Sequence, residues 1–146
     1  MATIPSEPPS QELARALAAH GQLLVLASHH LDAQVRCEAA VAVARQVGDR
    51  AVEGHALTTL GTSLGVLGHL EAGIAHLEHG RQIAKELGNV DDLHRAHANL
   101  ATVLELNGRT ADAVDVYLAG VDLARPSSGR WAVSAPSCCP TPPSHC

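Results

Sequence analysis

HALTTLGTSLGVLGHLEAGIAHLEHGRQIAKELGN, residues 55–89, is the stretch that decides the fold, because related stretches precede and follow it at a constant distance. Pairs of similar residues at a spacing of 40 are Ala56/Ala96, Leu60/Leu100, Leu64/Leu104, Gly68/Gly108, Gly80/Gly120 and Ala84/Ala124. A fainter copy precedes them, with Leu17, Gly21 and Leu24 in the places of residues 57, 61 and 64. A fixed period of roughly 20–50 residues is typical of a solenoid, in which each unit packs against its neighbours.

Each copy carries two runs of apolar residues at spacings of three and four, which is the period of an α-helix. The first predicted helix runs from residue 11 to about residues 28–30, and the next three cover about 32–47, 51–67 and 70–87. The fifth follows Asp91 or Asp92 and ends at the turn of residues 107–108, and the sixth follows Thr110 and ends at Arg125. Ser10, either Asp91 or Asp92, and Thr110 are the predicted N-caps. Glycines follow the predicted helix ends. The sequence therefore predicts an all-α fold of three stacked antiparallel hairpins, at about 10–49, 50–89 and 90–126.

The two ends of the chain lack this pattern. Residues 1–9 are rich in Pro and Ser and are predicted to be disordered, because they have little apolar surface to bury. After Pro126 the chain reads SSGRWAVSAPSCCPTPPSHC, residues 127–146. One interpretation is a disordered Pro/Ser/Cys-rich tail. The other is a frame shift in a GC-rich gene, in place of a fourth hairpin that the period predicts.

Composition excludes several classes of function. Aromatic residues make up 1% of the chain and its formal net charge is −5, whereas nucleic-acid binding requires basic patches and aromatic platforms. No secretory signal and no apolar segment of 18 residues is present. We therefore expect a cytoplasmic protein that binds neither nucleic acid nor membrane.

The alternation of large and small residues resembles the tetratricopeptide repeat (TPR) family. Its motif positions in the second hairpin are Leu57, Leu60, Gly61, Leu64, Gly68, Gly73, Leu77 and Gly80, and in the third His97, Leu100, Ala101, Leu104, Gly108, Ala113, Tyr117 and Gly120. The match covers about residues 11–125. Each repeat lacks the Pro that the family usually has near the end of its second helix, and is longer than the common repeat of about 34 residues. This long form is similar to arrays in bacterial signalling ATPases and LuxR-type transcription regulators.

The resemblance implies a short right-handed superhelix that binds a peptide or a partner helix in its concave groove. The first helix of each hairpin would line this groove. The corresponding residues are Arg15, Ala18, Ala19, Gln22, His55, Thr58, Thr59, Thr62, Arg95, Ala98, Asn99, Thr102 and Glu105. Arg95 and Asn99 lie four residues apart and are predicted to hold a carboxylate or a peptide amide. The alternative is a solvated helix face without a ligand.

Metal and catalytic sites have weaker support. The pairs His76/His79 and His94/His97 each place two imidazoles on one helix face, but packing and surface roles also explain them. Cys37 occupies a core position. We therefore predict no cofactor, no metal and no enzymatic activity.

The functional prediction is a non-catalytic protein-interaction module. The alternative is a truncated or frame-shifted sensor segment of a larger LuxR-type regulator or signalling ATPase. In either case the last helix is expected to expose an apolar side, and this uncapped end is expected to self-associate or to be unstable.

Overall fold

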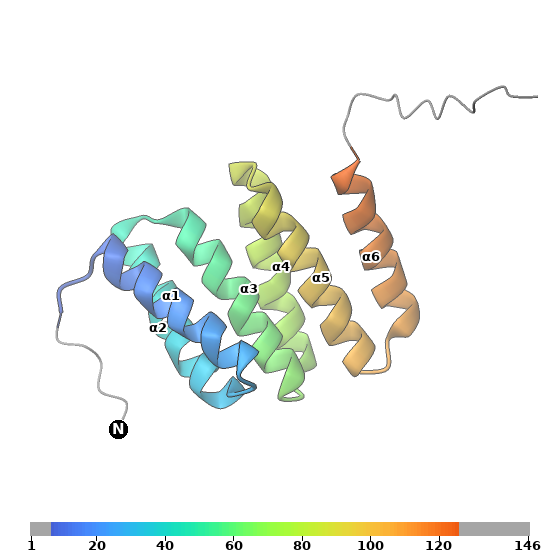
Figure 1. The fold of residues 1–146 in the computed structure, drawn as a ribbon, viewed down its shortest axis with the longest axis horizontal. Coiled ribbons are helices and arrows are strands. Elements are labelled where there is room, and N and C mark those ends of the chain that lie inside the picture. Colours follow the sequence, from blue (N-terminus) through green and yellow to red (C-terminus); the bar gives the residue numbers. More distant parts are fainter. Residues whose placement is uncertain (1–6, 126–146) are drawn as a thin grey trace, which may run out of the picture.

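The computed structural model describes residues 7–125, which form six α-helices in three consecutive antiparallel pairs (Figure 1). The helices are α1 (Gln11–Leu26), α2 (His30–Val47), α3 (Arg50–Val66), α4 (Leu70–Leu87), α5 (Val90–Leu106) and α6 (Thr110–Ala124). The all-α prediction and the pairing are confirmed, with α2 starting two residues earlier than predicted. Residues 1–6 and 126–146, which include most of the predicted N-terminal tail and all of the predicted C-terminal tail, lie outside the described part.

The first helix of each pair has a side-chain N-cap. Ser10, Asp49 and Asn89 each accept a hydrogen bond from the backbone N–H three residues ahead, at 3.0–3.1 Å. The predicted cap at Asp91 or Asp92 is therefore wrong, because both residues lie inside the first turn of α5. Asn89 stands 40 residues after Asp49, so the repeat extends to the caps.

The second helix of each pair begins differently. Thr110 is the first residue of α6 and does not cap it, and none of the three helices has a side-chain cap. Each is preceded by a turn with a left-handed residue, which is Gly68 (φ 90°) in the second hairpin and Gly108 (φ 77°) in the third. The first hairpin has Ser28 (φ 62°) at this position, where a side chain is less favourable than glycine.

Glycines bring α3 and α4 into direct backbone contact. A Cβ atom added to Gly61 would lie 2.6 Å from the Gly73 carbonyl oxygen, and one added to Gly73 would lie 2.8 Å from the Gly61 carbonyl oxygen. Nearer the other end of the pair, a Cβ on Gly80 would lie 2.8 Å from the Gly54 carbonyl oxygen. The central hairpin therefore has room only for glycine at these positions.

The core consists of small and aliphatic side chains, as the composition predicts. One cluster joins the first two hairpins through Leu17, Ala18, Ala40, Val41, Ala56, Leu57 and Ile83, and another joins the last two through Leu77, Leu100, Ala101, Val103, Leu104 and Ala113. Cys37 is fully buried beside Gly21, so its predicted core position is confirmed. Burial raises the pKa of this thiol to about 12, which keeps it protonated and unreactive at neutral pH.

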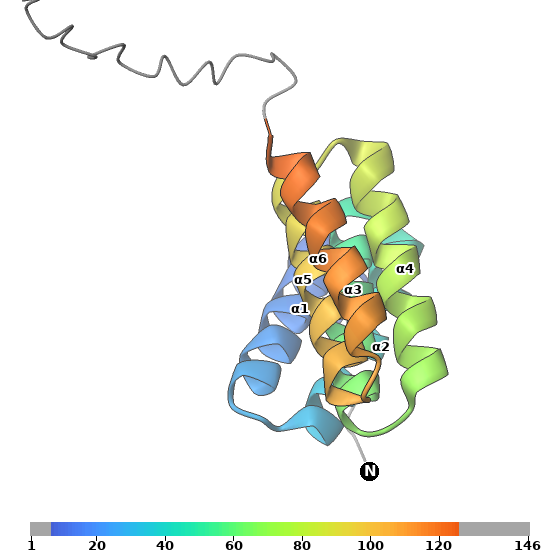
Figure 2. The same cartoon turned by 90° about the vertical axis from the view of Figure 1, so that its right-hand side faces the viewer.

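The first helices of the three pairs lie side by side. Helices α1 and α3 are in contact, as are α3 and α5, whereas α2, α4 and α6 do not contact one another within residues 7–125. Figure 2, viewed along the row from α6, shows α1 and α5 on one side and α4 on the other. Thus α1, α3 and α5 share one face, which we call the inner face. Within the described residues, no helix is long and apolar enough to cross a membrane.

Candidate functional site

A hollow of about 280 Å³ lies on the inner face, mainly between the middle of α1 and the first half of α3. The side chains that line it are Arg15, Ala18, Ala19, Gln22, Ala51, Val52, His55 and Asp92. Its apolar lining consists of three alanines and Val52, and its polar lining consists of Arg15, Gln22, His55 and Asp92. Five of these residues belong to the predicted groove set, so the repeat register brings them together although 40 residues separate Arg15 from His55.

A chain of polar contacts crosses the inner face at this hollow. The His55 Nε2 atom lies 2.8 Å from Gln22 Oε1, and His55 Nδ1 lies 3.0 Å from Asp92 Oδ1. Both neighbours are oxygen atoms, so both ring nitrogens donate only when the imidazole is protonated. A neutral ring satisfies both contacts if the Gln22 amide turns its NH₂ group toward Nε2. His55 thus links α1 to α5 through α3.

Arg95 completes this chain on α5. Its Nη2 donates to the His55 carbonyl oxygen at 2.8 Å, its Nη1 donates to Thr59 Oγ1 at 3.1 Å, and its Nε lies 3.5 Å from Asp92 Oδ1. The hydrogen bond from His55 lowers the pKa of Asp92, and the charge of Arg95 lowers it further. Burial lowers the pKa of Arg95, although Asp92 opposes this effect. The pair therefore ties α5 to α3.

This arrangement gives Arg95 partners within the protein. The guanidinium points into the array and only 22% of the side chain is exposed, so the role predicted for Arg95 and Asn99, holding a carboxylate or a peptide amide, stays a prediction. Sequence reasoning considered Asp92 only as a helix cap and missed its contact with Arg95. Its spacing of three residues before Arg95 is a signal for an ion pair on one helix face, and it could have assigned Arg95 an internal partner.

Two predicted groove residues on α3 are buried. Thr58 is 1% exposed, and its hydroxyl donates to the Gly54 carbonyl oxygen at 3.1 Å, inside the interface with α4. Thr59 is 2% exposed and lies beneath Arg95. The two residues are covered by different helices. Thr58 is covered by α4 at Gly80, whereas Thr59 is covered by Arg95 from α5.

The remaining predicted residues lie along the other half of this face. Thr62 and Asn99 are half-buried, while Ala98, Thr102 and Glu105 on α5 are exposed. The Thr102 hydroxyl lies 3.3 Å from the hydroxyl of Tyr117 on α6. None of these side chains belongs to the hollow. The structure therefore divides the predicted groove into a hollow at α1 and α3 and a second group of residues, of which Ala98 lines a separate pocket between α5 and α6.

A buried carboxylate joins the first two hairpins. Glu53 on α3 is 5% exposed, and its oxygens accept hydrogen bonds from Arg45 Nε at 2.8 Å and from Arg50 Nη1 at 3.3 Å. Although burial alone would raise the pKa of Glu53, the hydrogen bond from Arg45 and the charges of both arginines lower it. The carboxylate is therefore ionised at neutral pH and is an element of the junction between hairpins.

The histidine pairs do not form a larger cluster. Within residues 7–125, no group of three or more His, Cys, Asp or Glu side chains could hold a metal ion. Burial lowers the pKa of His76, and the neighbouring His79 lowers it further. His97 is 6% exposed, in agreement with its core position in the repeat.

Comparison of the chain with models of known protein families found no match, and comparison with curated proteins also found none.

Proposed function

We propose that this protein is a non-catalytic interaction module whose inner face binds a peptide or a partner helix. The observation that carries the proposal is the hollow between α1 and α3, which combines apolar walls with polar groups at its edge. Arg15 leaves 63% of its side chain exposed beside this hollow, 3.6 Å from Asp49. An apolar side chain of a partner fits between the alanines, while Arg15 and Gln22 pair with the partner's backbone or carboxylates. The TPR resemblance supports the same surface.

A displayed library of random peptides tests this proposal. Peptides that the wild-type protein selects are expected to lose binding to an Ala19→Arg variant, because the new side chain fills the hollow. Ala72→Arg, at an exposed position on α4, introduces the same charge away from the inner face and is the matched control. Equal binding by Ala19→Arg, or no enrichment of any peptide, contradicts the proposal.

A second candidate is a sensor or docking segment of a larger bacterial LuxR-type regulator or signalling ATPase. The exposure of α6 favours it. Tyr117 is 42% exposed, while Leu77, 40 residues earlier, is fully buried; similarly, Leu123 is 45% exposed and Ile83 only 1%. Helix α6 thus has the pattern of a helix that a further hairpin covers.

Sequencing the gene beyond the Arg125 codon in all three reading frames tests this second candidate. A frame that encodes a fourth hairpin and a DNA-binding or nucleotide-binding domain supports it. The absence of both from every frame contradicts it, and leaves the interaction module as the function to be tested.

A further inference from the structure

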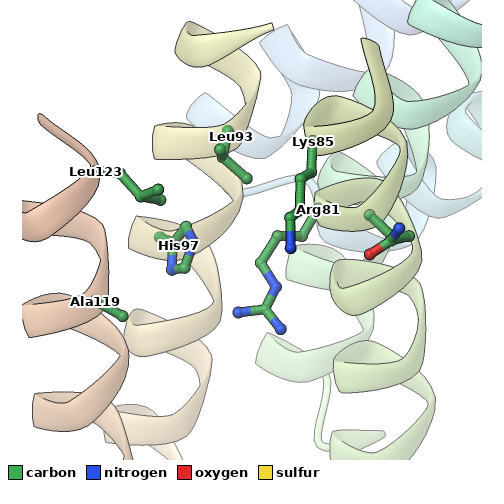
Figure 3. A pocket seen from close by; sticks show the side chains of 7 residues that line it. Arg81, Lys85, Leu93, His97, Ala119 and Leu123 are labelled. Atoms are coloured by element: carbon green, nitrogen blue, oxygen red, sulfur yellow. The ribbon is translucent and has the colours of Figure 1, made fainter. Parts of the chain in front are cut away.

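A second pocket, of about 260 Å³, lies between α4, α5 and α6 (Figure 3). Arg81 and Lys85 reach it from α4, Leu93 and His97 from α5, and Leu123 from α6. Figure 3 shows the cationic side chains on one side of the space and Leu123 on the other, with His97 between them. This pocket shares no residue with the hollow on the inner face.

The repeat shows what this pocket lacks. Lys85 is the equivalent, 40 residues on, of Arg45, and Leu93 is the equivalent of Glu53. At the junction of the first two hairpins, Arg45 donates to the buried carboxylate of Glu53. At the next junction the cation remains, but leucine replaces the carboxylate. Lys85 accordingly forms no ion pair within the part of the chain that the structure describes.

His97 is a second sign of a missing partner. The same repeat position holds Leu57 in the second hairpin and Leu17 in the first, so an apolar residue suffices for packing. His97 is 6% exposed, and its Nδ1 atom has no hydrogen-bond partner within residues 7–125. A buried polar atom of this kind normally has a partner, because leaving it without one costs free energy. The ring also lines the pocket that contains Lys85.

We propose that this pocket binds a carboxylate carried on a small apolar body, which takes the place that Glu53 holds at the preceding junction. Lys85 forms the ion pair, and Arg81, which already contacts Glu78, adds positive charge. His97 donates a hydrogen bond to the carboxylate, while Leu93 and Leu123 contact the apolar part. The volume lies near the lower limit of about 300 Å³ for ligand pockets, so the ligand is small or is one side chain of a peptide.

The charges around His97 make its titration a probe of the site. Burial lowers the pKa of His97, and Arg81 on α4 lowers it further; the Val116 carbonyl on α6 and Glu78 on α4 raise it, and His94 on α5 lowers it. A carboxylate bound beside the ring favours the protonated form and raises this pKa. A neutral ligand of the same shape lacks that effect.

Nuclear magnetic resonance titration of the full chain with benzoate tests the proposal, with benzamide as the neutral analogue. Benzoate is expected to shift the ring signals of His97 and the methyl signals of Leu93 and Leu123 in a saturable manner, and to raise the pKa of His97. Lys85→Gln is expected to weaken benzoate binding about 10-fold. Arg109→Gln, on an exposed residue outside the pocket, removes the same charge and is the matched control.

Leu93→Glu tests the same idea in the opposite direction, because it places a carboxylate of the protein itself at the position that Glu53 holds at the preceding junction. It is expected to abolish benzoate binding while the protein remains folded, and to raise the pKa of His97 without any ligand. A blocked peptide, acetyl-Ala-Leu-Glu-Leu-Ala-amide, distinguishes the source of the carboxylate. Saturable binding of benzoate alone indicates a free acid, and tighter binding of the peptide indicates a protein partner. If neither binds, or benzamide binds as well as benzoate, the proposal is overturned.

Discussion

Replacing Gly61 by alanine tests the close contact between α3 and α4. The added methyl group would lie 2.6 Å from the Gly73 carbonyl oxygen and 2.8 Å from both the backbone nitrogen and the Cγ atom of Leu77. Two of these three atoms belong to the α4 backbone, so a side-chain rotation cannot relieve the contact. The two helices have to separate, which loosens the packing of the fully buried Leu77.

Two opposing effects set the size of the change. Overpacking in a core typically costs about 1–3 kcal/mol, and the upper end applies because backbone atoms block the site. Alanine is better than glycine inside a helix by about 1 kcal/mol, which offsets part of this cost. We therefore expect Gly61→Ala to lower the free energy of unfolding by about 2 kcal/mol.

Urea unfolding followed by circular dichroism measures this difference. Gly120→Ala is the matched control, since its methyl group would lie 3.2 Å from the Cβ atom of His97 and near no backbone atom of α5. We expect this control to change the stability by about 1 kcal/mol or less, because helix propensity and the mild contact oppose each other. If Gly61→Ala has the same free energy of unfolding as the wild type, and the slope of this free energy against urea concentration is unchanged, the claim that the α4 backbone blocks a side chain at Gly61 is refuted.

Two further predictions concern the polar chain and the exposed helix. The lowered pKa of Asp92 means that its contribution to stability is complete above its unfolded pKa of about 3.8 and is lost as the pH falls through the lower folded value. In urea unfolding, the free energy of unfolding of Asp92→Asn should therefore fall less below about pH 4 than that of the wild type. If the two proteins show the same pH dependence of the free energy of unfolding, Asp92 does not have the lowered pKa. Val121 on α6 is 54% exposed among other apolar residues, so the wild-type mass in light scattering should rise with concentration and Val121→Glu should suppress this. A wild-type mass that stays monomeric at every concentration contradicts self-association.

Most of the fold follows from local sequence signals that repeat. The apolar period, the glycines after the helices and the cap at Ser10 are each properties of a few neighbouring residues, and the period of 40 repeats the first two of these signals. The same reasoning placed a cap at Asp91 or Asp92, because an acidic residue in a first turn resembles an N-cap. In the structure the caps are Asp49 and Asn89, which lie 40 residues apart, so the repeat would have been the better guide.

The candidate site was less predictable, because its details depend on contacts between hairpins. The register of the repeat identified the residues of the inner face. It assigned the same groove positions to α1, α3 and α5, although the three helices have different neighbours. Thr58 is buried against Gly80 of α4 and Thr59 beneath Arg95 of α5. Arg95 turns inward because Asp92 and the His55 carbonyl receive it. Contacts of this kind join residues about 36–40 positions apart, beyond any helical spacing in the sequence.

The contact between α3 and α5 differs at its two ends. Toward the end of α3, Gly65 lies directly against Val103, and Asn107 Nδ2 donates to the Gly65 carbonyl oxygen at 3.3 Å. Toward the beginning of α3, the contact consists of the polar side chains around His55. Backbone packed against a branched side chain resists displacement, whereas long hydrogen-bonded side chains adapt to small shifts by rotating about their χ angles.

Mechanically, we expect the two ends of this contact to differ in stiffness. The end at Gly65 and Val103 is the stiffer one, and the end at His55, Asp92 and Arg95 is the more compliant one. A tilt of the third hairpin against the second would therefore change the spacing of α3 and α5 most at the end beside the hollow.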